Sequence, residues 1–211
     1  ADDKTEVTKW TYNTKIPSYG ATGWWDKSAY KEGMVLGDIW GLQFDRFLTE
    51  DDFNADGSLK AGLPDQTKVF PAGYQFAPGD VLYKDLDNNG EIVKQTNTND
   101  KGDLSVIGNA LPRLQFGLNL DAAWKGFDIS MFFQGVAKRK LWAAGNQVLP
   151  GFTTGEPFYK GAEDYWTPEN TDAFYPRPMD YQQSASGNYS VNDRYLLNMA
   201  YLRLKTFTVG Y

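Results

Sequence analysis

The pattern of hydrophobic and polar positions is clearest between Leu114 and Gln134. From Leu114 to Trp124 apolar residues occupy every second position, and after Lys125-Gly126 the alternation resumes at Phe127, with Phe132 as the exception. A period of two is typical of a β-strand whose two faces meet different surroundings. Because two residues are enough to connect antiparallel neighbours, the sequence predicts a hairpin of two long strands.

The length and the two faces of these strands suggest where the hairpin lies. Strands of about 9–11 residues cross a bilayer when tilted, whereas strands in globular sheets most often have about 5–6. Leu, Phe, Ile and Met on one face suit lipid, and Trp124 and Phe127 flank the turn, where an aromatic girdle would lie. The hairpin by itself is equally compatible with a soluble antiparallel sandwich that has one face exposed to water. The polar face, which suits a water-filled lumen, carries Gln115, Asn119, Asp121, Asp128 and Gln134.

Two further segments have the composition of strands. Met34 to Leu48 mixes large apolar residues with glycine, and Tyr201 to Tyr211 carries alternating apolar residues whose parity changes near Thr206. The change indicates either a β-bulge or the point where the strand leaves the lipid band.

Very long connections separate these strands, at about residues 49–112 and 138–198, and they are rich in Gly, Pro, Asn, Asp and aromatic residues. Compact soluble domains rarely contain such loops, whereas outer-membrane barrels combine short periplasmic turns with long extracellular loops. Lys125-Gly126 would be one of the short periplasmic turns. The pattern therefore favours an all-β fold that is part of a large antiparallel transmembrane β-barrel.

The composition excludes several classes of function. The 211 residues include 21 basic and 27 acidic side chains, and the formal net charge of -6 disfavours nucleic acid as a partner. The chain has neither cysteine nor histidine, which removes Ser-His-Asp and Cys-His catalysis and the usual transition-metal sites. We therefore expect a protein that is not an enzyme. The sequence contains no run of 18 apolar residues that would predict a transmembrane helix.

An acidic loop resembles the beginning of a calcium-binding loop. Oxygen-bearing residues stand at positions one, three and five, glycine at six and an apolar residue at eight, but position twelve is Thr96 instead of glutamate. A loop in which Asp and Asn cap backbone amides is the alternative. A weaker copy begins at Asp52 and has Leu63 at position twelve. The expected Ca²⁺ ligands are Asp85, Asp87, Asn89 and the Glu91 carbonyl, closed by Asp100 or Asp103.

Several segments, taken in order, resemble the SusC/RagA family of TonB-dependent transporters from Bacteroidetes. The similarity covers about residues 33 to 211, and the departures are the first ~32 residues, Val35-Leu36 and the stretched segment from Val93 to Asp103. The segments that carry it are Gly33 to Phe47, Gly79 to Ile92, Ile107 to Asn119, Trp124 to Gly135, Tyr165 to Asn170 and Tyr201 to Lys205.

The resemblance implies a much larger protein in the bacterial outer membrane, and residues 1–211 are then expected to be a fragment of one transmembrane β-barrel domain. In that family a barrel of 22 strands surrounds an N-terminal plug, a TonB box couples the barrel to energy, and a SusD-like surface lipoprotein lies over the extracellular face. The implied function is TonB-dependent import of a nutrient, either an oligosaccharide (glycan) or a peptide. Its partners would be TonB, through a part absent from this chain, the SusD-like lipoprotein, the substrate and outer-membrane lipid.

Two other functions remain open from the residues. A soluble extracellular carbohydrate-binding or adhesion module would stack tryptophans on sugar rings. A glycoside hydrolase would use a pair of carboxylates from among residues such as Glu50, Asp51, Glu163 and Asp164, although no spacing singles out one pair. For a transporter, loop aromatics are the expected contacts with ligand or lid, although each could simply pack its own loop. These are Trp142, Phe152, Phe158, Tyr159, Tyr165 and Trp166.

Overall fold

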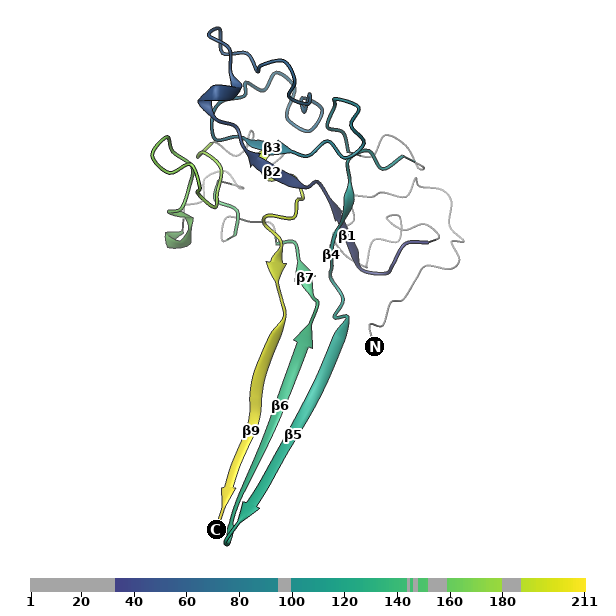
Figure 1. The fold of residues 1–211 in the computed structure, drawn as a ribbon, viewed down its shortest axis with the longest axis vertical. Coiled ribbons are helices and arrows are strands. Elements are labelled where there is room, and N and C mark those ends of the chain that lie inside the picture. The colour runs from purple at the N-terminus through teal and green to yellow at the C-terminus, as the bar shows by residue number, and fades with distance from the viewer. Residues whose placement is uncertain (1–32, 95–99, 144, 146–147, 152–158, 180–186) are drawn as a thin grey trace.

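The computed structural model describes residues 33–94, 100–143, 145, 148–151, 159–179 and 187–211. Over these residues the chain is all-β: its strands pair antiparallel in four sheets, and it contains no α-helix. A long, narrow sheet extends away from a head built of loops and short strands (Figure 1). None of the helical turns in the described ranges is long and apolar enough to cross a bilayer.

The long sheet has the order β5-β6-β9, with β5 at Leu114–Trp124, β6 at Phe127–Ala137 and β9 at Tyr201–Gly210. The predicted hairpin is confirmed, because β5 and β6 pair without a break from Leu114↔Ala137 to Trp124↔Phe127. Lys125 and Gly126 connect them with φ angles of 49° and 89°. Positive φ at both central residues is the requirement of a type I′ turn, whose twist matches that of the strands.

The third strand contains a β-bulge, which is one of the two explanations that the change of parity near Thr206 allowed. Phe132 pairs with Thr206 and Phe133 pairs with Leu204, so Lys205 is the extra residue on β9. The bulge offsets the change of parity in the sequence, so the apolar residues on both sides of it lie on the same face. Those residues are Leu202, Leu204, Phe207 and Val209.

The prediction of one continuous strand from Met34 to Leu48 is wrong. The segment forms β1 (Asp38–Gly41), which pairs with β4 (Ser105–Asn109), and β2 (Phe44–Phe47), which pairs with β3 (Val81–Tyr83). Between them the backbone N–H of Leu42 donates to the carbonyl of Val191, and Phe44 N–H donates to the Asp193 carboxylate. These contacts with a distant segment divide the apolar run between two partners.

The head has a hydrophobic core of its own, to which both long connections contribute. They contain β7 (Lys140–Leu141), β8 (Leu197–Asn198) and the 3₁₀ turns η2 (Glu50–Asp52) and η3 (Lys160–Ala162). A smaller cluster of Leu149, Tyr189 and Tyr195 lies in the second connection. The main cluster includes Met34, Leu42, Phe47, Val69, Phe70, Val81, Tyr83, Ile92, Leu104, Trp166 and Ala173.

Candidate functional site

The long sheet has one continuous apolar face. Leu118, Phe133 and Leu204 lie opposite one another across the three strands, and the next row joins Leu120, Met131 and Phe207. Leu118 and Leu204 are each 48% exposed and Phe207 is 58% exposed. No described element covers this face (Figure 1). It is a contiguous surface of large apolar side chains, which folded proteins keep out of water.

The opposite face carries polar cross-strand pairs. The Ser130 hydroxyl donates to Asp121 at 2.6 Å, and the Arg203 guanidinium donates to the Gln134 side-chain oxygen at 3.2 Å. Phe132, the exception in the alternation, lies on this face over Gly117, where an added Cβ would come within 3.0 Å of its ring. The smallest residue on β5 thus accommodates the only large aromatic side chain that β6 places among the polar positions.

Aromatic side chains gather at the free end of the long sheet. The rings of Phe127 and Tyr211 lie 4.7 Å apart, and the Lys125 ammonium lies 4.7 Å from the centre of the Trp124 ring. Trp124 is 71% exposed. Aromatic rings with a nearby cation are typical of a membrane–water interface.

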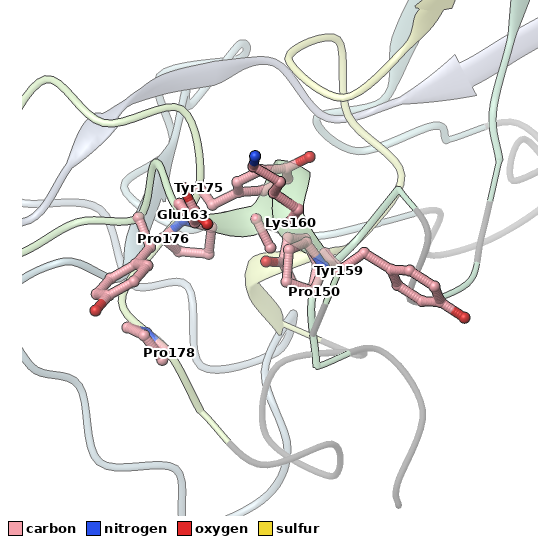
Figure 2. Close-up of a pocket in the computed structure, with 10 residues that line it drawn as sticks. Pro150, Tyr159, Lys160, Glu163, Tyr175, Pro176 and Pro178 are labelled. Carbon is pink, nitrogen blue, oxygen red and sulfur yellow. The ribbon is translucent and has the colours of Figure 1, made fainter. Parts of the chain in front are cut away.

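A cavity of about 380 Å³ lies in the head, at the second connection (Figure 2). Tyrosine and proline dominate its walls, and Lys160 and Glu163 add one charge of each sign. Its described lining residues are Pro150, Tyr159, Lys160, Ala162, Glu163, Tyr165, Tyr175, Pro176, Pro178 and Tyr189.

The small tyrosine cluster forms the inner side of this cavity. Tyr189 is only 4% exposed, and Tyr175 stacks on Tyr195 with 6.0 Å between ring centres. Burial raises the pKa of Tyr189, and burial together with the Asp164 carboxylate raises the pKa of Tyr175. Both phenols therefore stay protonated at neutral pH and can donate hydrogen bonds.

The predicted contact residues separate into two groups. Tyr159 and Tyr165 line the cavity, and Trp142 packs against the tyrosine cluster next to it. Trp166 instead lies in the main core, 6% exposed, with its ring so close to Gly79 that an added Cβ would be 2.5 Å away. Phe152 and Phe158 lie outside the described residues.

The cavity also includes residues that sequence reasoning missed. They are the three prolines and the pair Tyr175 and Tyr189. Alternating Tyr-Pro-Arg-Pro at residues 175–178 was a signal in the sequence, because proline beside an aromatic residue gives rigid, flat surface.

The acidic loop brings three of the predicted metal ligands together. One carboxylate oxygen from each of Asp85, Asp87 and Asp103 lies within 4.8 Å of the others. Asp103 is fully buried and accepts hydrogen bonds from Leu86 N–H and Val93 N–H, both at 2.8 Å. Desolvation, followed by the charge of Asp103, raises the pKa of Asp87. A cation would relieve this repulsion between like charges.

The other predicted ligands face backbone amides. The Asn89 side-chain oxygen accepts from Glu91 N–H at 2.7 Å, and Asp100 accepts from Gly102 N–H at 2.9 Å. Asp85 accepts from Gly90 N–H at 2.7 Å. The weaker copy has the same character, because Asp52 accepts from Thr49 N–H at 2.8 Å and Asp56 accepts from Ser58 N–H at 3.0 Å. The loop geometry is thus that of capped Asx turns with three carboxylates meeting at one point.

A buried ion pair joins the two long connections. Asp80, fully buried, accepts from the Arg177 guanidinium at 2.8 and 3.2 Å and from the Tyr74 hydroxyl at 2.8 Å. The Asn188 amide donates to the same carboxylate at 3.0 Å. Because Asp80 lies in the first connection and Arg177 and Asn188 in the second, this network holds the head together as one unit.

The carboxylates considered for hydrolysis have different surroundings. Asp164 accepts from the Asn170 amide at 3.1 Å and from Phe174 N–H at 3.0 Å, so it closes a turn. Glu163 lines the cavity, and Glu50 and Asp51 are exposed on η2. These positions give no shared site of two facing carboxylates of the kind that glycoside hydrolysis uses.

Comparison with known proteins gives two relatives, although no family model matches the chain. TonB-dependent receptor P3 of Formosa agariphila is 27% identical over 187 residues, which are 86% of this chain and 15% of that receptor. TonB-dependent receptor P26 of the same organism is 34% identical over 129 residues, 59% of this chain and 12% of that receptor. The matched region is therefore a small part of either relative. Both relatives are named TonB-dependent receptors, so the matched residues of this chain are similar to a part of two such proteins.

Proposed function

We propose that this chain is part of a SusC/RagA-type β-barrel in the bacterial outer membrane that imports an oligosaccharide or a peptide by a TonB-dependent mechanism. The observation that carries the proposal is the sheet β5-β6-β9, which has strands of 11, 11 and 10 residues, one apolar face and one polar face. Strands of this length span a hydrocarbon core when tilted, with the apolar face toward lipid and the polar face toward the lumen.

The uncovered apolar face weighs against a soluble carbohydrate-binding or adhesion module. Full burial of a large apolar side chain stabilises a protein by about 1.5–3 kcal/mol, so a soluble sandwich would place a second sheet over this face. Leu118, Leu204 and Phe207 instead stay about half exposed. Lipid supplies the missing apolar surroundings, and neighbouring barrel strands would pair with the free edges of β5 and β9.

The shape of the molecule sets the proposed orientation. The type I′ turn and its aromatic cluster lie at the far end of the sheet from the head (Figure 1). Outer-membrane barrels have short turns on the periplasmic side and long loops outside. The head is then extracellular, where it would meet the nutrient and a SusD-like lipoprotein, and TonB would act from the periplasm through another part of the protein.

A second proposal concerns calcium. We propose that Asp85, Asp87 and Asp103, with the Glu91 carbonyl, hold one structural Ca²⁺ that braces the first connection, and that Asn89 and Asp100 orient the loop. Calcium at about 100 times its Kd would stabilise the folded head by about 2.7 kcal/mol. Asp103→Asn should abolish the calcium-dependent part of the stability, whereas Asp56→Asn in the weaker copy should retain it. Equal stability of the unaltered protein in calcium and in chelator would contradict the proposal.

Deletion of the gene for the full-length receptor tests the import function. Cells that lack it should lose growth on one class of nutrient, either oligosaccharides or peptides, and should regain it when the gene is restored. Uptake should stop when TonB is removed. Unchanged growth on every nutrient tested, or uptake that persists without TonB, would contradict the proposal.

A further inference from the structure

The chain contains one Asn-Gly pair, Asn89-Gly90, which lies in the acidic loop of the first connection. In such a pair the backbone nitrogen of glycine can attack the side-chain carbon Cγ of asparagine, because glycine has no side chain to hinder the approach. Gly90 has a φ of 85°, and a Cβ added to it would meet no atom within 4 Å beyond its chain neighbours. Both residues are exposed, so water reaches the reacting groups.

The hydrogen bonds of this loop match what the reaction needs. The Gly90 N–H donates to the Asp85 carboxylate at 2.7 Å, so an acceptor for its proton is already in place. The Asn89 side-chain oxygen accepts from Glu91 N–H at 2.7 Å, and this bond strengthens as negative charge develops on the oxygen. The same bond closes an Asx turn, which folds the side-chain amide back over the Gly90 peptide. Asp87 accepts from the amide nitrogen Nδ2 at 3.0 Å and so keeps the amide oxygen turned toward Glu91.

We propose that Asn89 is a site of spontaneous deamidation that the geometry of this loop promotes. The Gly90 nitrogen forms a bond to Cγ of Asn89 and loses its proton along the hydrogen bond to Asp85. Asp85 returns this proton through water to Nδ2 of Asn89, which leaves as ammonia when its bond to Cγ breaks. Water then opens the resulting succinimide ring at either of its carbonyl carbons. The product is an aspartate or an isoaspartate at position 89.

The weaker copy of the loop contains a matched turn that lacks the carboxylate acceptor. Asp56 accepts from Ser58 N–H at 3.0 Å and closes the same kind of Asx turn as Asn89. Gly57 has a φ of 81° and equally open surroundings. Its N–H, however, donates to the backbone carbonyl of Asn54 at 2.9 Å. A carbonyl oxygen is a much weaker base than a carboxylate, so an asparagine placed at position 56 should react more slowly than Asn89.

Deamidation would change the acidic loop without the action of an enzyme. Either product adds a negative charge beside Asp85 and Asp87, and the isoaspartate also lengthens the backbone, because the chain then runs through Cγ. The spacing of the carboxylates in the first connection would therefore change in the modified protein. This inference goes beyond the import function proposed above and does not depend on it, so failure of either leaves the other in place.

Mass spectrometry of the purified full-length Asp56→Asn receptor tests the inference, because this variant has two Asn-Gly pairs in one molecule. The receptor is kept in detergent in a mildly alkaline buffer with a calcium chelator, and samples are digested at intervals to measure conversion of amide to acid at each pair. Conversion at Asn89 should be at least about tenfold faster than at position 56. Equal rates, faster conversion at position 56, or no conversion at Asn89 would overturn the inference.

A second variant tests the role of Asp85 directly. Asp85→Asn keeps a side-chain oxygen that can accept from Gly90 N–H but removes the carboxylate that takes the proton. Conversion at Asn89, followed as isoaspartate formed over time, should slow by at least about tenfold. Glu91→Gln is the control, because it removes a negative charge from the same loop and keeps the backbone N–H, and its rate should match that of the unaltered receptor. An unchanged rate in Asp85→Asn, or an equal decrease in both variants, would contradict the proposed reaction.

Discussion

The long sheet and the head differ in how they bury their apolar side chains. The sheet leaves its apolar side chains uncovered and relies on regular cross-strand pairing, with the pairs Leu118↔Phe133 and Phe133↔Leu204 as its centre. The head has little regular structure but encloses Ile39, Leu42 and Leu48 completely. It also buries the polar network around Asp80.

This difference indicates where each region gets its stability. The head buries its own apolar side chains and pairs its own buried polar groups. A substitution in its core should therefore lower the stability of the head whether or not the protein is in a membrane. In the proposed barrel the sheet depends on its surroundings, because lipid and neighbouring strands would cover the apolar side chains that it exposes. Substitutions in the sheet should therefore act on assembly in the membrane, and the following tests are ordered from the largest expected effect to the smallest.

Asp80→Ala should have the largest effect. It leaves the Arg177 guanidinium and the Asn188 amide without their shared acceptor, and breaking a buried pair in this way costs about 3–5 kcal/mol. The free energy of opening of the head, measured by hydrogen exchange in the full-length receptor, should fall by that amount while the barrel remains assembled. The exposed Glu169→Ala is the control, and an equal effect of the two variants would contradict this role of Asp80.

Leu118→Arg should impair assembly of the sheet instead of the head. Leu118 lies in the middle of β5 on the apolar face, and an arginine near the bilayer midplane costs about 2–4 kcal/mol. Asn119→Arg places the same charge one residue away on the polar face and should assemble normally. Folded receptor in the outer membrane, measured as heat-modifiable migration on gels, should fall only for Leu118→Arg. Similar yields of both variants would show that the two faces do not differ in their surroundings.

Gly126→Ala should destabilise the hairpin by about 1–2 kcal/mol. Gly126 has a φ of 89° and no atom within 4 Å of an added Cβ, so the cost comes from the backbone alone. Gly161→Ala is a suitable control, because Gly161 also has open space around it but no positive φ. Urea midpoints of the assembled receptor should decrease for the first variant and stay unchanged for the second; the reverse order would exclude the type I′ turn as the reason.

Loss of the pair between Asp52 and Arg46 should have the smallest effect, and the size of that effect depends on pH. A hydrogen bond from Arg46 is the main cause that lowers the pKa of Asp52 to about 2, against desolvation that raises it. Because the folded-state pKa is lowered, this stabilisation is complete above pH 4 and is lost as the pH falls from about 4 to 2. Since Arg46 is 43% exposed, solvent screening reduces the contribution to about 1 kcal/mol. Asp52→Asn should remove this part of the pH dependence of head opening, and an unchanged profile would contradict it.

The sequence was most informative where structure is local. The alternation from Leu114 to Trp124 fixes the faces of β5, and Lys125-Gly126 fixes the register of β6, because both depend on residues next to one another. The change of parity near Thr206 located the bulge for the same reason.

Sequence reasoning failed where partners are far apart along the chain. The run from Met34 to Leu48 has the composition of one strand, but its halves pair with strands that begin at Val81 and at Ser105. Asp80 and Arg177 are 97 residues apart, and no local pattern connects them. The cavity has the same origin, since Pro150 and Tyr189 meet only after the second connection folds back on itself.

The central claim is that the two faces of β5-β6-β9 meet lipid and water, and spin-label accessibility measures this most directly. Nitroxides attached to single cysteines along β5 and β6 of the full-length receptor, in outer membranes, report contact with oxygen in lipid and with a nickel chelate in water. Labels at Leu118, Leu120 and Met131 should favour oxygen, and labels at Asn119, Asp121 and Ser130 should favour the nickel chelate. The same accessibility on both faces, or preference for the nickel chelate at Leu118 and Leu120, would contradict the account.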